Sequence, residues 1–209
     1  IANKRVVFVG ESHDRYEDHL NQLAVIEGLQ AQGRDLAIGM EFFQQPFQAQ
    51  VDAFIAGEIG EPEFLRGTEY FDRWRFDYRL YQPILRFARE NRIPVIALNI
   101  PSEITRQVAT KGIDGLSEEE RKQIPAEIDR SNKVYEDRLT GIFKQHPDSE
   151  HRNFDNFVQA QLVWDEGMAE RAAQHFEKQP DGHMVLLVGS GHLMYGDGIP
   201  DRVKRRVPV

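Results

Sequence analysis

The sequence contains no cysteine and no long apolar run, and its net charge is negative. The absence of cysteine excludes disulfides, thiolate metal sites, cysteine nucleophiles and haem attached covalently through cysteine. No segment approaches the roughly 20 consecutive apolar residues of a membrane-spanning helix. The formal net charge of −8 argues against general nucleic-acid binding, which requires a basic surface. A short basic cluster near the end is expected to be the exposed side of a terminal element: Arg202, Lys204, Arg205 and Arg206.

The composition is that of an ordinary globular protein, with 40% hydrophobic and 29% charged residues. A chain of 209 residues can bury roughly 70% of its unfolded surface, so it needs neither a disulfide nor a structural metal to fold. We therefore expect a single α/β domain over residues 1–209. Because the sequence begins without Met, almost directly in a predicted strand, we expect any targeting segment to lie outside it.

Four short apolar runs are predicted to be strands, at residues 5–9, 35–40, 94–98 and 184–188. Helical periodicity predicts helices between the first three of them, at residues 16–32, 46–56 and 78–90. Strands that are apolar along their whole length are typical of a parallel sheet, where both faces are covered. The pattern therefore predicts an α/β fold with a mostly parallel sheet flanked by helices.

Residues 102–178 differ from the rest because they are polar and contain no convincing strand. Helices are expected at about 126–145 and 154–178. The run Ser117-Glu118-Glu119-Glu120 has the form of a helix capping box. We expect this stretch to be a mainly helical insertion or subdomain, which either covers one edge of the sheet or meets a partner.

Two loops at opposite ends of the sequence are alike. The first predicted strand ends in Gly10-Glu11-Ser12-His13-Asp14, and the last ends in Gly189-Ser190-Gly191-His192. If both strands belong to one parallel sheet, both histidines lie at its carboxyl edge, where open α/β folds bind ligands. The second and third strands bring Glu41 and Asn99 to the same edge. The sequence therefore predicts a site there.

These side chains suit two kinds of chemistry. Two histidines and two carboxylates can hold a divalent metal ion and activate a water molecule. Alternatively, a histidine or tyrosine can be an axial ligand of haem iron, and Phe42 beside Glu41 offers a flat apolar wall for a porphyrin. Each residue taken singly also has a simpler interpretation, such as Glu11 or Asp14 capping the helix that follows.

Other candidates are less informative. A serine hydrolase is disfavoured because neither Ser12 nor Ser190 lies in a Gly-x-Ser-x-Gly motif. The remaining histidines fall on predicted helices or polar loops and are expected at the surface: His19, His146, His151, His175 and His183.

Nearly the whole sequence, from about residue 5 to 200, resembles the ChaN-like haem-binding uptake proteins, part of the wider Tiki, TraB and erythromycin-esterase-like group. The similarity is carried by the two glycine–histidine loops, a helical segment at 159–169, and two further runs: Gly39-Met40-Glu41-Phe42-Phe43 and Ile93-Pro94-Val95-Ile96-Ala97-Leu98-Asn99.

The resemblance implies a binding protein rather than an enzyme: an iron-regulated lipoprotein of the bacterial envelope that takes part in haem uptake and binds haem noncovalently. It implies a homodimer with haem held between two subunits, and an outer-membrane uptake receptor as a further partner. We expect the cofactor-binding residues to be His13, Glu41, Phe42, His192 and Tyr195. His192 and Tyr195 are the candidate ligands of haem iron because they lie on the same loop.

The same resemblance implies an alternative, a metal-dependent hydrolase like the Tiki proteases or the esterases. That enzyme would use His13, Glu41 and His192 with a divalent metal such as manganese or zinc. The esterase branch uses a histidine from the first loop as a base, which here is His13. A third interpretation is an interaction module that works through the helical stretch 102–178.

Overall fold

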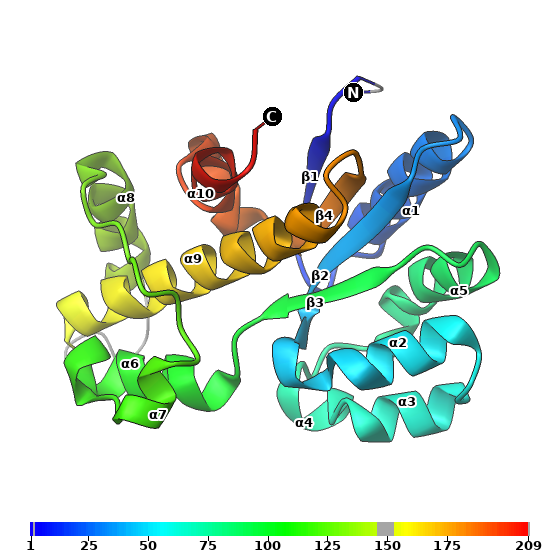
Figure 1. Cartoon of the computed structure of the whole chain (residues 1–209). Coiled ribbons are helices and arrows are strands. Elements are labelled where there is room, and N and C mark those ends of the chain that lie inside the picture. Colours follow the sequence, from blue (N-terminus) through cyan, green and yellow to red (C-terminus); the bar gives the residue numbers. More distant parts are fainter. Residues whose placement is uncertain (2, 146–152, 209) are drawn as a thin grey trace.

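The computed structural model describes residue 1, residues 3–145 and residues 153–208. Four parallel strands form one sheet, in the order β1-β4-β2-β3. Figure 1 shows this sheet between helices, so the predicted α/β fold with a parallel sheet is confirmed. The strands are β1 (Val6–Glu11), β2 (Leu36–Gln44), β3 (Val95–Asn99) and β4 (His183–Gly189).

The last strand lies between the first two. β4 pairs with β1 in parallel from Val6↔Met184 to Glu11↔Gly189, and it pairs with β2 on its other side. Each strand is rich in apolar residues, and all nine residues of β2 are buried. Segments about 180 residues apart in the sequence therefore run side by side and end at the same edge of the sheet.

Helices connect the strands and follow the last one. Between β1 and β3 lie α1 (Tyr16–Gln30), α2 (Gln48–Ala56), α3 (Glu61–Gly67), α4 (Tyr70–Arg73) and α5 (Gln82–Glu90). Between β3 and β4 lie α6 (Ser102–Lys111), α7 (Glu118–Arg121), α8 (Lys133–Lys144) and α9 (Phe154–Lys178). After β4, two short turns of 3-10 helix, η5 (Ser190–His192) and η6 (Met194–Gly196), lead to α10 (Ile199–Arg206).

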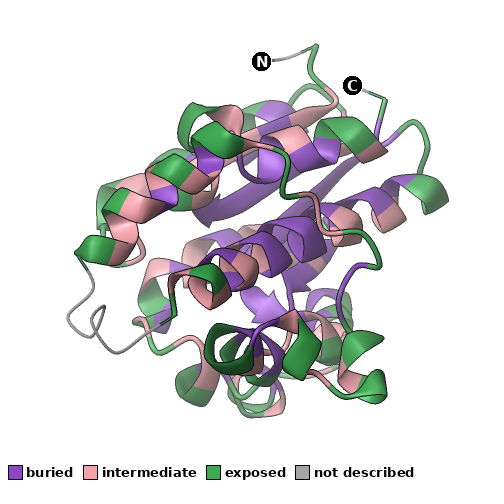
Figure 2. Ribbon diagram, turned by 90° about the vertical axis from the view of Figure 1, so that its left-hand side faces the viewer, coloured by how far each residue is buried: buried purple, intermediate pink, exposed green. Residues whose placement is uncertain are grey.

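The helices cover both faces of the sheet, and the strands are the most completely buried part of the protein (Figure 2). One apolar core joins one face of the sheet to α1, α2, α3 and α5. A second core joins the other face to α9 and α10. The chain thus forms three layers, with the sheet in the middle and helices on each face. A parallel sheet that is buried on both faces requires this arrangement.

The long helix α9 links the sheet to the helical part of the chain. Its C-terminal half packs on the sheet through residues such as Ala169 and Phe176, while its N-terminal half packs on α6 and α8 through Val163 and Leu162. The described residues of 102–178 contain helices and connecting segments and no strand. The division of the chain into one domain with a helical subdomain stays a prediction.

One local expectation differs from the structure, and another is confirmed. The helix expected at 126–145 begins only at Lys133, where the Asn132 side chain accepts a hydrogen bond from the Tyr135 N–H at 3.1 Å and caps the helix. The predicted capping box at Ser117 forms, with Glu120 bonding back to the Ser117 N–H at 2.8 Å.

The basic cluster at the end of the chain is exposed only in part: Lys204 and Arg205 are exposed, as expected, whereas the expectation was wrong for Arg202. Arg202 is only 2% exposed, and its Nε lies 3.2 Å from a carboxylate oxygen of Glu166, which is itself fully buried. Arg205 and Arg206 contact the same carboxylate at 2.9 and 2.6 Å. A buried charge is tolerated when it is paired. These arginines therefore attach α10 to α9.

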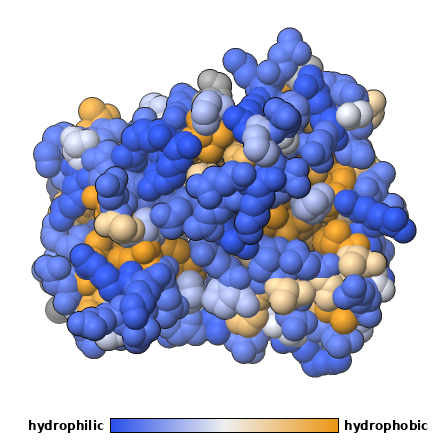
Figure 3. Space-filling model, viewed as in Figure 1, coloured by the Kyte–Doolittle hydropathy of each residue, from blue (hydrophilic) through white to orange (hydrophobic). Residues whose placement is uncertain are grey.

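Among the helices that the structure describes, none is both long enough and apolar enough to cross a membrane. The face of the molecule seen in Figure 3 is mostly hydrophilic, and its apolar side chains gather in separate patches.

Two helical glycines offer a matched test of the packing of α9. A Cβ atom at Gly167 would overlap the buried side chain of Ile100, whereas a Cβ atom at Gly141 in α8 would meet nothing within 4 Å. We expect Gly167→Ala to lower the free energy of unfolding by about 1–3 kcal/mol through overpacking. Gly141→Ala should raise it by up to about 1 kcal/mol, because alanine favours a helix. Urea unfolding measures both; if Gly167→Ala matches the wild type, α9 does not pack this closely on Ile100.

Candidate functional site

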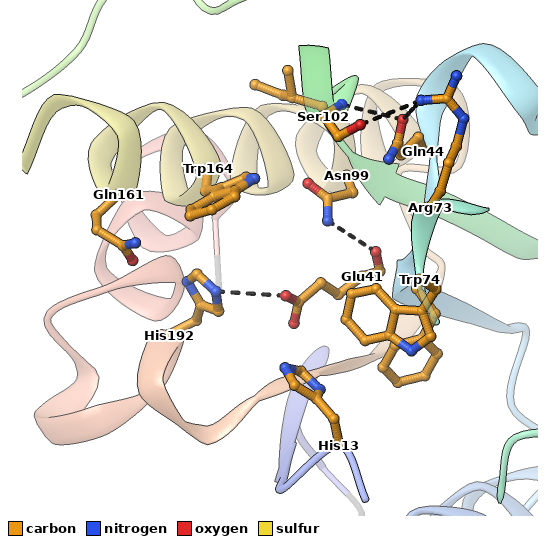
Figure 4. A pocket seen from close by; sticks show the side chains of 12 residues that line it. His13, Glu41, Gln44, Arg73, Trp74, Asn99, Ser102, Gln161, Trp164 and His192 are labelled. Atoms are coloured by element: carbon orange, nitrogen blue, oxygen red, sulfur yellow. Dashed lines mark hydrogen bonds and ion pairs between the residues drawn. The ribbon is translucent and has the colours of Figure 1, made fainter. Parts of the chain in front are cut away.

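A pocket of about 320 Å³ opens at the carboxyl edge of the sheet. Its lining includes His13 after β1, Glu41 and Phe42 in β2, Asn99 at the end of β3, and His192 after β4. Figure 4 shows the side chains that line it. The parallel pairing of the strands brings these distant residues together, because every strand ends at the same edge.

Glu41 is the buried carboxylate at the centre of the pocket, with only 6% of its surface exposed. Its Oε2 accepts a hydrogen bond from the Gly189 N–H at 2.6 Å, and its Oε1 lies 3.6 Å from Nε2 of His192. Burial raises the pKa of Glu41, but the charge of His192 and these hydrogen bonds lower it, and the net result is a pKa below the ordinary value. Glu41 is therefore ionised at neutral pH.

An irregularity in the pairing of β2 with β3 shapes this part of the pocket. The register shifts between Met40 and Gln44. Side chains normally alternate between the two faces of a strand, but a bulge redirects them. Glu41 and Phe42 are neighbours in sequence, yet both line the pocket.

His192 is held between two carboxylates. Its Nδ1 lies 2.5 Å from Oδ1 of Asp165 in α9, and Oδ2 of Asp165 accepts a hydrogen bond from the Tyr135 hydroxyl at 2.7 Å. Burial lowers the pKa of His192, but the charges of Glu41 and Asp165 raise it well above 6.5. His192 is therefore positively charged: it donates a hydrogen bond to Asp165 and forms an ion pair with Glu41.

His13 forms a second histidine–carboxylate pair across the pocket. Its Nδ1 is hydrogen-bonded to Glu11, which is 2% exposed. Burial lowers the pKa of His13, but this hydrogen bond and the charges of Glu41 and Glu11 raise it above the ordinary value. A Cβ atom at Gly189 would lie 3.0 Å from Cε1 of His13, so a larger residue here would require the ring to move by a few tenths of an ångström.

Two expectations about neighbouring residues were wrong. His19 is not at the surface: it is 3% exposed, and its Nε2 lies 3.2 Å from Oε2 of Glu11. Nor does Glu11 cap α1, whose N-cap is Arg15 without a side-chain hydrogen bond. His175 and His183 are half-buried, and His146 and His151 lie outside the described residues.

Aromatic rings form the walls of the pocket. The Trp74 ring lies 4.7 Å from that of His13 and 5.2 Å from that of Phe42, measured between centroids. Trp164 lies beside His192, at a centroid distance of 6.4 Å. The pocket thus combines charged groups on its floor with flat apolar sides, as small-molecule sites commonly do.

Tyr195 is placed differently from the other predicted site residues. Its side chain is 84% exposed and does not line the pocket, although it follows His192 by three residues. Its backbone adopts φ 56°, a left-handed conformation that is rare for a bulky residue. The structure therefore brings His13, Glu41, Phe42 and His192 together. It leaves Tyr195 on the outer surface of the loop that follows β4.

Comparison with known proteins identifies the family of the chain. The sequence profile of the family described as haem-binding uptake, Tiki superfamily, ChaN matches residues 1–203. The chain belongs to the ChaN family. Its fold is similar to that of ChaN from Campylobacter jejuni, whose structure shows cofacial haem binding, with a TM-score of 0.73 and 19% identity over 96% of this chain and 76% of that one.

The chain is also similar to proteins that are not named ChaN. An erythromycin esterase, EreC, in its open conformation has a TM-score of 0.54 and 15% identity over 97% of this chain and 67% of that one. The chloroplast protein RETICULATA-RELATED 5 of Arabidopsis thaliana is 27% identical over 230 residues, which cover all of this chain. The chain spans about 30% of the length of that curated relative.

Analysis of the sequence missed Trp164 and Arg73, which line the pocket, and Asp165, which contacts His192 beside it. Asp165 and Trp164 come from α9, and Arg73 comes from α4. The adjacent acidic residues Asp165 and Glu166, both buried in an otherwise apolar stretch of helix, were the available signal. Arg73 lies in an aromatic segment without clear periodicity, so nothing in the sequence singled it out.

The alternative function, a metal-dependent hydrolase, requires a set of side chains that can hold a metal ion. Within residues 1, 3–145 and 153–208, no group of three or more histidine or acidic side chains is arranged to hold a metal ion. His13 and His192 are each bonded through Nδ1 to a carboxylate.

The charge of His192 gives the protein a defined pH dependence. Because its folded-state pKa is raised, its pairing with Glu41 and Asp165 stabilises the fold fully below pH 6.5, and this contribution is lost as the pH rises through the folded-state pKa. Glu41, with a lowered pKa, contributes above pH 4.5 and loses its contribution in acid. An NMR titration should show His192 titrating above 6.5 in the wild type and at lower pH in Glu41→Gln.

His175 is the internal control, because burial lowers its pKa and neither of the two carboxylates contacts it. It should titrate below 6.5 in both proteins. If the His192 pKa is the same in Glu41→Gln as in the wild type, the two residues are not electrostatically coupled.

Proposed function

We propose that this chain binds haem noncovalently at the carboxyl edge of its sheet. The observation that carries the proposal is the match of the haem-binding uptake family to residues 1–203, nearly the whole chain. The pocket at that edge adds a physical reason, since it is lined by Phe42, Trp74 and Trp164 together with polar groups. Aromatic and apolar walls suit a flat, largely apolar macrocycle.

The size of the pocket indicates how haem would lie. Its volume of about 320 Å³ is at the lower end of the roughly 300–1,000 Å³ of small-molecule sites. A macrocycle would therefore enter with one edge and leave the remainder outside. An exposed porphyrin face is apolar surface that a second protein molecule can cover, which supports the proposal of haem held between two copies of this chain.

Haem, when bound, would supply an iron atom that can take an oxygen or nitrogen ligand from the protein. His192 and Tyr195 are the proposed ligands. The His192 ring has both nitrogens directed at carboxylates, so it would have to lose its proton to bind iron. Tyr195 is exposed and is held in a rare backbone conformation, which is typical of functional positions. We therefore favour the phenol oxygen of Tyr195 as the ligand.

His13, Glu41 and Phe42 are proposed to contact haem without binding iron. Phe42 would pack on the macrocycle, while the pair of His13 and Glu41 would keep the floor of the pocket polar. The wider proposal is a role in bacterial haem uptake at the cell envelope, as a lipid-anchored periplasmic or outer-membrane protein that meets an uptake receptor. Family membership supports this role.

Titration with haemin tests the proposal. The wild type should give a shifted Soret band that saturates at a defined stoichiometry. Tyr195→Phe removes the phenol oxygen but keeps the ring, so it should weaken binding and change the visible bands that report an oxygen ligand. Tyr16→Phe is the matched control, because Tyr16 is also exposed, at 52%, but lies on α1.

The outcomes of this titration test two claims separately: that Tyr195 binds iron, and that the protein binds haem. A spectrum of Tyr195→Phe that matches the wild type would show that Tyr195 does not bind iron. A wild type that produces no saturable Soret shift would refute haem binding itself.

A further inference from the structure

Arg73 contributes the one guanidinium to the lining of the pocket, within the residues that the structure describes. It is the last residue of α4, and its side chain is 19% exposed. The guanidinium carbon lies 4.8 Å from the centre of the Phe47 ring, and Nε donates a hydrogen bond to Glu69 at 2.8 Å. The Phe47 ring and the Glu69 carboxylate therefore hold the guanidinium in one orientation without a bound ligand.

One amino group of Arg73 is occupied by the protein and the other is not. NH1 donates to Oε1 of Gln44 at 2.9 Å and to the carboxylate of Glu103 at 2.9–3.0 Å. NH2 donates to no described residue. Figure 4 shows the guanidinium beside Gln44 and Ser102, at the end of the pocket away from His192. Arg73, which lines the pocket, therefore keeps hydrogen-bonding capacity that no described residue uses.

Glu103 places a carboxylate beside Arg73, at the end of the pocket away from His192. It lies in the first turn of α6, and both of its carboxylate oxygens approach NH1 of Arg73. The Ser102 hydroxyl and the N–H of Glu103 itself also donate to this carboxylate. The side chain of Glu103 is nevertheless 58% exposed, and ion pairs of exposed groups are weak. Another carboxylate can therefore replace it.

Arg73 also stands between two cavities. A second cavity of about 320 Å³ is lined by Phe47, Glu103 and others, and it shares Gln44 and Arg73 with the pocket. A ligand too large for the pocket would extend past these two side chains. Its outer groups would then lie next to the guanidinium and the positive end of the α6 helix.

We infer that Arg73, together with the first turn of α6, forms a subsite for a carboxylate of the bound ligand, and that Glu103 occupies this subsite until the ligand replaces it. The inference rests on the proposed function, because haem carries propionate carboxylates at one edge of its macrocycle. The iron would then face the loop of His192 and Tyr195, and a propionate would pair with Arg73 at the opposite end of the pocket. Arginine is suited to this role because it binds carboxylates through two parallel hydrogen bonds.

The test compares haemin with haemin dimethyl ester, in which both propionates are esterified, in the same detergent solution. Arg73→Gln should weaken haemin binding about tenfold, the effect of losing a charge-assisted hydrogen bond. It should leave binding of the ester unchanged, which also shows that the variant has an intact pocket. Glu103→Gln removes the competing carboxylate, so it should tighten haemin binding and leave ester binding unchanged.

Arg79→Gln is the matched control, since it removes the same charge from a side chain that is 84% exposed, pairs with Asp77 and does not line the pocket. It should bind both ligands like the wild type. Equal effects of Arg73→Gln on haemin and ester, or no effect on either, would overturn the subsite while leaving haem binding in place. Failure of the wild type to bind either ligand would refute the proposed function, and the subsite with it.

Discussion

The buried carboxylate of Glu41 is the group on which the site depends. It lies on β2, accepts a hydrogen bond from Gly189 at the end of β4, and its backbone carbonyl accepts one from the Asn99 side chain at the end of β3, at 3.1 Å. A buried carboxylate is costly unless it is hydrogen-bonded and paired with a positive charge. Glu41 meets that requirement through Gly189 and His192, so it fixes the ends of three strands relative to one another.

Through His192, the carboxylate of Glu41 also connects the sheet to the helical layer. His192 links Glu41 to Asp165 of α9, and Asp165 in turn accepts a hydrogen bond from Tyr135 of α8. The buried side chain of Arg202 reaches within 3.9 Å of Asp165 from α10. Positive and negative groups thus alternate from the C-terminal helix to the floor of the pocket. Such a network costs much if one member is lost, because the remaining charges stay buried.

The sequence predicted the fold because its signals were local and regular. Apolar runs marked the four strands, and the glycines that end the first and last of them marked the site edge. The prediction could place His13 and His192 together because parallel strands end at one edge. It failed for His19 because the buried face of α1 carries the polar residues His19 and Gln22 as well as apolar ones, and His19 contacts the buried carboxylate of Glu11. It failed for Arg202 because a basic residue near a terminus is usually exposed, whereas here the buried Glu166 requires partners.

The side chains that distant helices contribute to the site could not be predicted from the sequence either. Asp165 contacts His192 from α9, which packs on the sheet, and Arg73 lines the pocket from α4, which lies between β2 and β3. Neither arrangement follows from spacing along the chain. The position of Tyr195 relative to the pocket depends on the backbone conformation of a single loop residue. The sequence thus located the edge of the sheet at which the site lies, and tertiary packing determined which helices complete it.

The account predicts where haem touches the protein, and paramagnetic NMR tests this most directly. Ferric haem broadens the amide resonances of nearby residues, whereas zinc protoporphyrin, which is diamagnetic, does not. Comparison of the two complexes should show broadening centred on the strand ends, including Gly10, Glu41, Gly189 and Gly191, with Gly33 at the opposite end of the sheet unaffected. Broadening centred on α10 or on the outer face of α1, with the strand ends unchanged, would contradict the account.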